Sequence, residues 1–285
     1  MAHPGLVWPV PAGTPISDQP SRGVKLAVAA TAPFGAVVLE GLAARHDVEL
    51  LLTRPDRPKG RGRREGPPPA KEAAERLGIP VEQPERLEAV PGTADTIVVV
   101  AYGLLIPESL LTERLWLNVH PSLLPRWRGA APVERALMAG DQETGVTIHR
   151  TIAELDAGPI AARRSFPIGR EDDAGAVYER SAALAVELLD EVLPDPSFTP
   201  QPEEGVTYAE KIRPEDRELD WSRPPKEVHD RIRALSPHIG ARGELHGRPV
   251  TIWRAQLVDE KVVPVEVQPD GRRRMAYEEF LRGLR

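Results

Sequence analysis

The chain has no cysteine, which excludes disulfide bonds and thiolate metal sites from its 285 residues. Because a reducing compartment suits such a chain, we expect a cytoplasmic protein. No apolar run approaches the roughly 18 residues that a membrane helix needs, so we expect no membrane contact. The formal net charge of −6 argues against a generally adhesive nucleic-acid binder, but it does not exclude a local basic patch.

Several widespread catalytic signatures are also missing. The sequence contains no G-x-x-x-x-G-K-[ST], no H-E-x-x-H and no G-x-S-x-G. The first predicted strand continues into A-T-A-P-F-G and not into G-x-G-x-x-G, which argues against a dinucleotide site. Asparagine is nearly absent as well, since Asn118 is the only one in a chain with 31 Arg and 6 Lys. Because the composition almost excludes asparagine, its single occurrence at position 118 is a candidate for a residue that the chemistry of the protein requires.

The order of apolar patterns predicts the fold of residues 24–193. Short apolar runs alternate there with segments of helical periodicity, which indicates a Rossmann-like, doubly wound α/β sheet with mostly parallel strands. The run T-I-V-V-V-A is typical of a strand that is buried on both faces. The expected strands span residues 24–30, 48–53, 96–101, 115–120, 146–151 and 159–164, and the expected helices span residues 34–45, 71–77, 130–139 and 173–193.

The remaining segments predict a tail, a linker and a second domain. Residues 1–23 are rich in proline and have no sustained period, so we expect a disordered tail. Residues 194–205, P-D-P-S-F-T-P-Q-P-E-E-G, predict a linker. Residues 206–285 predict a smaller, β-rich domain with a helix over 226–234 and strands over 248–257 and 262–267.

The most informative stretch is L-N-V-H-P-S-L-L-P-R-W-R-G, residues 117–129. Asn118 and His120 lie two apart on a predicted strand, so their side chains point the same way, at the edge where open α/β sheets bind ligands. An amide and an imidazole aimed together can stabilise an oxyanion that forms from a carbonyl. Asp156, which follows another strand, would raise the pKa of His120 and could accept a proton from an attacking amine. Taken singly, each residue is more often structural, and the combination carries the prediction.

Together these residues resemble the folate-dependent formyltransferase family. The family pattern is N-x-H, then S-L-L-P, then R-G, and an Asp 36 residues after the His, and the chain matches it at Asn118, His120, residues 122–125, residues 128–129 and Asp156. The resemblance covers roughly residues 24–285 and includes T-R-P-D-R-P-K-G-R-G-R and V-V-V-A-Y-G-L-L-I-P. The branch of the family that formylates methionyl-tRNA is the most similar.

The resemblance implies that 10-formyltetrahydrofolate donates its formyl group to the methionine α-amine of initiator tRNA, without a metal. Asn118 and His120 would hold the oxyanion, and Asp156 would keep His120 charged and help carry the amine proton away. The second domain would be OB-like and contact tRNA, and no protein partner is evident. The residues that the resemblance assigns to the folate site are Ser122, Leu123, Leu124, Pro125, Ala101, Tyr102, Leu104 and Ile106.

A basic segment follows the second predicted strand. Residues 54–64 carry six basic side chains and one acid, and their glycine and proline content predicts a mobile loop. Phosphates favour such a loop, and the resemblance places it on the tRNA acceptor stem, although a merely solvated loop is the alternative. The expected tRNA contacts are Arg54, Arg57, Lys59, Arg61, Arg63 and Arg64.

Three other functions fit parts of the same pattern. A nucleotide-sugar N-formyltransferase would use the same donor and the same three catalytic residues, but it should lack the basic loop. A formyltetrahydrofolate hydrolase would use water in place of the amine. A tRNA-binding module without activity would not need Asn118, His120 and Asp156 together, so their presence argues against it.

Overall fold

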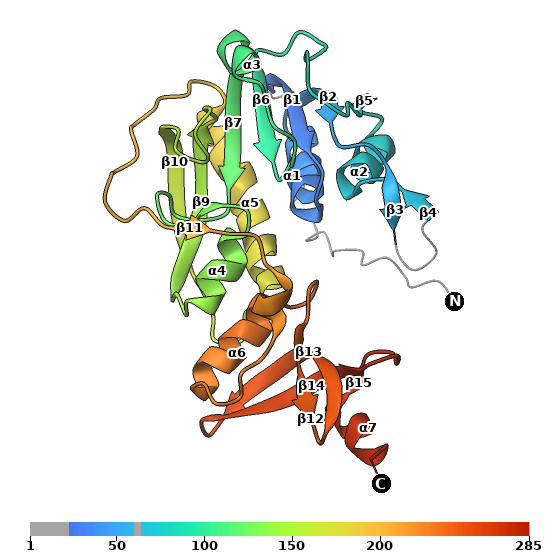
Figure 1. Ribbon diagram of the computed structural model, residues 1–285. Helices are drawn as coiled ribbons and strands as arrows, with labels where there is room; N and C mark the ends of the chain where they lie inside the picture. Colours follow the sequence, from blue (N-terminus) through green and yellow to red (C-terminus); the bar gives the residue numbers. More distant parts are fainter. Residues whose placement is uncertain (1–22, 60–63, 285) are drawn as a thin grey trace.

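The computed structural model describes residues 23–59 and 64–284. The predicted tail therefore lies almost entirely outside the described residues, as does the centre of the basic segment. The first domain is built on a seven-stranded sheet in the order β10-β9-β7-β6-β1-β2-β5 (Figure 1). Its strands are β1 (Lys25–Ala30), β2 (Asp47–Leu52), β5 (Val81–Glu82), β6 (Thr96–Val100), β7 (Leu115–His120), β9 (Glu143–Arg150) and β10 (Ile160–Pro167).

Most neighbouring strands of this sheet run parallel. The pairs from β5 through β2, β1 and β6 to β7 are parallel, whereas β9 runs antiparallel to β7 and β10 runs antiparallel to β9. The predicted doubly wound, mostly parallel α/β class is therefore confirmed. The antiparallel direction of β9 was not foreseen, and it decides which side chains meet at the end of β7.

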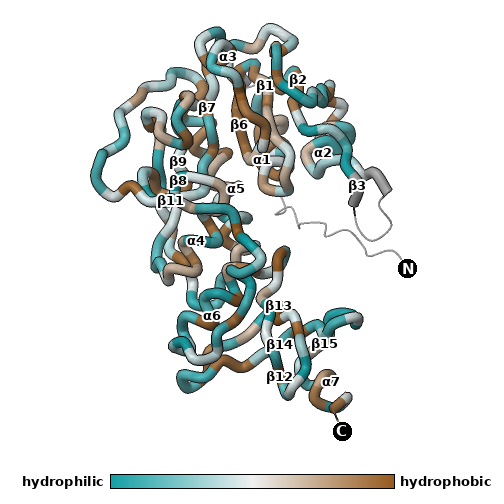
Figure 2. The backbone as a smooth tube through the Cα atoms, in the orientation of Figure 1, coloured by the Kyte–Doolittle hydropathy of each residue, from teal (hydrophilic) through white to brown (hydrophobic). Residues whose placement is uncertain are grey.

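The central strand β6 explains why the sheet is stable with helices on both faces. Val98 and Val100 point into one apolar cluster, while Ile97 and Val99 point into another. The hydrophobic colour of the central strands contrasts with the hydrophilic outer segments in Figure 2. This two-sided burial confirms what the unbroken β-branched run of β6 predicts.

Of the five helices that the structure describes in the first domain, four pack on the sheet, whereas the one at Pro132–Met138 packs on neighbouring helices, and the helix ends follow from local sequence. The longest, α5, begins after Asp173, whose carboxylate accepts a hydrogen bond from the backbone N–H of Ala176 at 2.9 Å. The helix α2 ends at Gly78, which adopts the left-handed conformation (φ 70°) that glycine tolerates. The helices are α1 (Pro33–Ala43), α2 (Pro69–Leu77), α3 (Glu108–Glu113), α4 (Pro132–Met138) and α5 (Ala174–Val192).

The basic segment is more ordered at its base than the sequence predicts. The strands β3 (Arg57–Lys59) and β4 (Arg64–Gly66) pair antiparallel, so the expected loop is partly a hairpin. Asp56, at its root, accepts hydrogen bonds from Lys71 at 2.9 and 3.0 Å and from Gln83 at 2.7 Å. These contacts anchor the hairpin to the first domain.

The second domain is the predicted small β-rich unit. Its antiparallel sheet has the order β12-β13-β14-β15, and the helix α6 packs on β13 and β14. Its elements are β12 (Ala241–Leu245), β13 (Arg248–Val258), β14 (Lys261–Pro269), β15 (Met275–Ala276), α6 (Pro225–Ala234), α7 (Tyr277–Arg282) and the 3-10 helix η1 (Pro214–Arg217). A further short parallel pair joins β8 (Arg128–Gly129) to β11 (Tyr208–Ala209).

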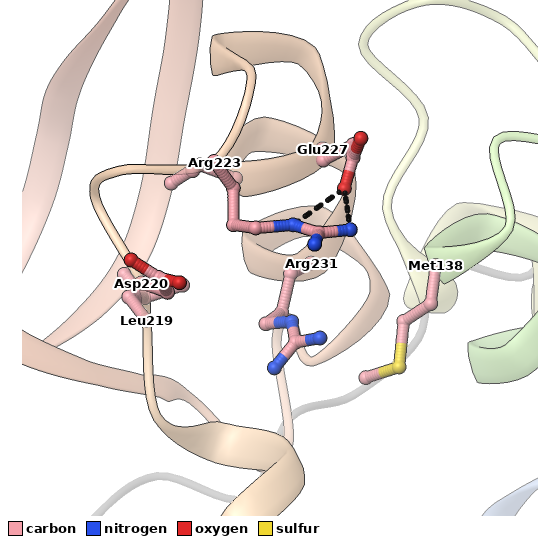
Figure 3. Close-up of a pocket in the computed structure, with 7 residues that line it drawn as sticks. Met138, Leu219, Asp220, Arg223, Glu227 and Arg231 are labelled. Carbon is pink, nitrogen blue, oxygen red and sulfur yellow. Dashed lines mark hydrogen bonds and ion pairs between the residues drawn. The ribbon is translucent and has the colours of Figure 1, made fainter.

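Polar contacts hold the two domains together. The buried guanidinium of Arg233 donates to the backbone oxygen of Asp172 at 3.0 Å and to the carboxylate of Asp230 at 2.8 Å. Beside this junction lies a cavity of about 350 Å³ between Met138 of α4 and Arg231 of α6 (Figure 3). Within the described part of the chain, no helix has the length and apolar character needed to cross a membrane.

Candidate active site

The end of β7 presents Asn118 and His120 on the same face of the strand. The carboxylate of Asp156 lies between them: its Oδ1 is 3.2 Å from Nδ2 of Asn118, and its Oδ2 is 3.7 Å from Nδ1 of His120. The arrowheads of β6 and β7 point toward the end of the molecule that carries the second domain (Figure 1). The structure therefore brings the three sequence-predicted catalytic residues together at the carboxyl edge of the sheet.

Two hydrogen bonds and a special backbone conformation hold Asp156 in place. The residue has a left-handed backbone (φ 48°), which is uncommon for a residue other than glycine. Its Oδ2 accepts a hydrogen bond from the backbone N–H of Gly129 at 2.8 Å, and its backbone oxygen accepts one from Gln201 at 2.7 Å. Gln201 comes from the predicted linker, so that segment supports the site directly.

Burial controls the charge of His120. The ring is 4% exposed, and desolvation lowers its pKa below the ordinary value, while the charge of Asp156 acts in the opposite direction without overcoming it. The sequence-based expectation of a His120 kept charged by Asp156 therefore differs from the resting structure. The backbone oxygen of Trp127, which can only accept, lies 2.7 Å from Nε2 of His120, so Nε2 carries a hydrogen.

Asp156 itself stays ionised. Burial acts to raise the pKa of its carboxyl group, but the polar contacts of the site, among them the N–H of Gly129, outweigh burial and hold the pKa below its ordinary value. The site thus pairs a carboxylate that is charged at neutral pH with an imidazole that is neutral at rest. Such a pair can take up one proton during a reaction.

His149 is a site residue that the sequence reasoning missed. It lies on β9 directly opposite Asn118 in the antiparallel pair with β7, and it is 1% exposed. Its Nε2 is 3.0 Å from Nδ2 of Asn118 and 3.6 Å from Oδ1 of Asp156. The signal that could have found it is the strand register, because directly opposed residues share one face of a sheet.

The predicted folate loop, residues 122–125, is held by hydrogen bonds to Arg126 and to Thr147 of β9. Ser122 is fully buried and donates through its hydroxyl to the backbone oxygen of Arg126 at 2.7 Å. Leu124 is also fully buried, and its N–H donates to the hydroxyl of Thr147 at 3.1 Å. Pro125 is buried and Leu123 is half-buried. These contacts fix the loop next to His120.

The other predicted folate wall follows β6. Ala101 is exposed with a left-handed backbone (φ 47°), and Leu104 and Ile106 pack partly buried against the apolar cluster of β6. Tyr102 is 2% exposed, and burial raises its pKa to about 12. The hydroxyl groups of Tyr102 and Thr151 are buried with no hydrogen-bond partner among the described residues.

A groove of about 650 Å³ lies beside Asp156. Its lining includes Arg128, Ala157, Gln201 and Tyr208, so it runs between the catalytic loop and the predicted linker. Arg128 is 8% exposed and donates to the side-chain oxygen of Gln201 at 2.8 and 3.2 Å. The groove therefore borders the Asp156 loop on the linker side.

The predicted tRNA contacts are only partly described. Arg54 is half-buried near Gly103, and its Nε atom is buried with no hydrogen-bond partner in the described part of the chain. Arg57 is exposed at the start of β3. The side chains of Lys59 and Arg64, and all of Arg61 and Arg63, lie outside the described residues. The described residues hold no group of three or more side chains suited to a metal ion.

Comparisons with known proteins identify relatives that are similar over most of the chain. The family model described as formyl transferase matches residues 24–193, and the one described as formyl transferase, C-terminal domain, matches residues 211–263. A methionyl-tRNA formyltransferase of Cereibacter sphaeroides is 41% identical over 285 residues, which cover 88% of this chain and 93% of that protein.

Solved structures show the same fold. A methionyl-tRNA formyltransferase from Clostridium thermocellum aligns with a TM-score of 0.61 at 14% identity, covering 87% of this chain and 98% of that one. HypX from Aquifex aeolicus, in complex with tetrahydrofolic acid, aligns with a TM-score of 0.64 at 20% identity, covering 92% of this chain and 47% of that one.

Proposed function

Because the chain belongs to the formyl transferase family, we propose that it transfers the formyl group of 10-formyltetrahydrofolate to the α-amine of methionine on initiator tRNA. This activity serves translation initiation in the cytoplasm. The observation that carries the proposal is the convergence of Asn118, His120 and Asp156, with Asp156 within 3.7 Å of both partners. Relatives of the same name, similar over most of the chain, support the acceptor.

The first step is the attack of the amine nitrogen on the formyl carbon. As that bond forms, the π electrons of the carbonyl move onto its oxygen, and Asn118 donates an N–H to the resulting oxyanion. The negative charge that develops on the oxyanion favours protonation of the His120 ring. When the ring shares the proton that the amine loses, its positive charge stabilises the oxyanion in the transition state more than the neutral ring could.

The second step moves one proton. The pair of Asp156 and His120, 3.7 Å apart, accepts the proton that the amine loses and returns it to the folate nitrogen when the carbon–nitrogen bond to folate breaks. The amine has then lost one hydrogen and the folate nitrogen has gained one. Tyr102 follows the carboxyl end of β6, and the family resemblance assigns it to the folate site.

The acceptor follows from charge and placement. The hairpin β3–β4 extends from the first domain on the side of the molecule where the second domain lies (Figure 1). Residues 54–64 carry six basic side chains and one acid, so they form a concentrated positive segment in a chain of net charge −6. A polyanion such as tRNA suits this segment better than a small acceptor with few phosphates does.

The experiment that tests the acceptor compares three substrates. We expect turnover of 10-formyltetrahydrofolate with charged initiator tRNA, and none above background with an amino-sugar nucleotide or with water alone. Faster turnover with the amino-sugar nucleotide would assign the chain to sugar formylation, and release of formate without any acceptor would assign it to hydrolysis. Absence of turnover in all three reactions would contradict formyl transfer itself.

A second prediction concerns the basic hairpin. Replacing Arg57, Arg61 and Arg63 by Gln should raise the KM for charged initiator tRNA, because phosphate contacts are lost, and leave folate affinity almost unchanged. Each lost contact should also make the salt dependence shallower by about 0.9 in the slope of log affinity against log salt. The measurement is the rate at two salt concentrations for both proteins. Equal rates and equal slopes would remove this segment from the tRNA interface.

A further inference from the structure

The side-chain amide of Asn118 has two possible orientations, and only one can serve an oxyanion. Its Nδ2 lies 3.2 Å from Oδ1 of Asp156 and 3.0 Å from Nε2 of His149. The carboxylate only accepts hydrogen bonds, so the amide must direct an N–H toward Asp156. The other N–H of the same group then faces His149, and the state of that ring decides whether the contact is favourable.

The contacts of His149 show which ring nitrogen accepts. Its Nδ1 lies 3.1 Å from the backbone oxygen of Arg150, which can only accept, so Nδ1 carries a hydrogen. Gly158 lies against this oxygen so closely that a Cβ would stand 1.8 Å from it. The Asn118 amide directs its second N–H at Nε2 of His149, 3.0 Å from Nδ2, so Nε2 offers its lone pair to Asn118. A flipped amide would place its oxygen against that lone pair and against the Asp156 carboxylate.

We infer that His149 is a positioning residue for formyl transfer, which holds the Asn118 amide with its NH₂ group toward the reacting oxygen. The inference rests on the proposed function. In the resting state both N–H groups of Asn118 are engaged, one by Asp156 and one by His149. In the proposed first step, the N–H that faces Asp156 also donates to the oxyanion as it forms, while His149 keeps the other in place.

The kinetic test uses two substitutions of one residue. His149→Leu removes the acceptor and should lower kcat roughly tenfold, the worth of about one hydrogen bond, with little change in the KM for folate. His149→Gln restores an acceptor oxygen and should recover most of the rate. In an Asn118→Ala background, His149→Leu should cost almost nothing further, because the residue acts through Asn118. An equal loss in both backgrounds would overturn the inference.

A second readout does not depend on activity. Asn118 is the only asparagine in the chain, so labelling with ¹⁵N-asparagine gives one side-chain amide pair by NMR. His149→Leu should shift one of its two hydrogens and speed its exchange with water, and His149→Gln should leave both near the wild-type positions. An unchanged pair in His149→Leu would contradict the inference even if the enzyme transfers formyl groups. A changed pair without turnover would instead contradict the proposed function.

The matched control is a second buried histidine. His229 of α6 is 3% exposed and contacts the backbone oxygen of Ala255 at 3.2 Å, within the second domain. His229→Leu should lower stability without changing kcat or the Asn118 amide signals. If it changed both as His149→Leu does, the effect of the latter would reflect general loosening of the fold, and the positioning role would be rejected.

Discussion

His120→Ala should lower kcat by about 10²–10³, the typical cost of losing one oxyanion-stabilising group. The ring meets negative charge only near the transition state, so the loss should fall on kcat and leave the affinity for folate nearly intact. The ring is buried beside Asp156 and donates a hydrogen bond to the backbone oxygen of Trp127. The methyl group of alanine can neither carry a positive charge nor donate a hydrogen bond, so it cannot stabilise the oxyanion in place of the ring. The measurement is steady-state turnover together with direct folate binding.

Thermal unfolding of His120→Ala supplies the control. Because the substitution leaves space in a buried site, some loss of stability is expected, and the rate should be measured well below the unfolding temperature. A folded variant that turns over at the wild-type rate would remove His120 from the mechanism. A loss that appears only as weaker folate binding would make it a binding residue.

Asp156→Asn should lower kcat by about 10²–10⁴, because the amide cannot accept the amine proton and general-base contributions are of that size. The same variant should lower the pKa of His120 further. The charge of Asp156 raises that pKa against the larger effect of burial, so its removal leaves burial less opposed. Titration of the His120 ring by NMR measures the second effect.

The direction of the titration separates two interpretations of this pair. Because burial already holds the wild-type pKa of His120 below its ordinary value, the ring gains its proton on acidification, and it should do so at still lower pH in Asp156→Asn. A higher pKa in the variant would show that Asp156 does not act on the ring by its charge. An unchanged pKa with a large loss of rate would leave Asp156 as a proton acceptor only.

The sequence predicted the parts of the site that depend on local period. Two-residue spacing at the end of a strand places Asn118 and His120 on one face, and the structure shows both beside Asp156. His149 escaped because its meeting with Asn118 depends on β9 running antiparallel to β7. The spacing of apolar residues along a strand does not show whether the strand runs parallel or antiparallel to its neighbour, because the period of two is the same in both cases.

Short helices and strands were also not predicted from the sequence. The helix α3 has six residues and the strands β8 and β11 have two each, too few to show a period. The charge state of His120 was also missed, since a sequence shows a carboxylate partner but not the depth of burial that opposes it. Long or strongly patterned segments such as β6 and α5 were found close to their observed ends.

The contact of Gln201 with the backbone oxygen of Asp156 bears on the modularity of this enzyme. Judged by composition, the catalytic module stops at residue 193, and the segment after it is a tether. Yet Thr199 pairs with β10, Gln201 supports the Asp156 loop, and Thr207 accepts a hydrogen bond from the backbone N–H of Trp127. The residues that support the catalytic loop therefore extend beyond residue 193 to Thr207, just before β11. A recombination event that exchanged the second domain at the compositional boundary would pass on an incomplete active site, so the two domains are expected to be inherited together.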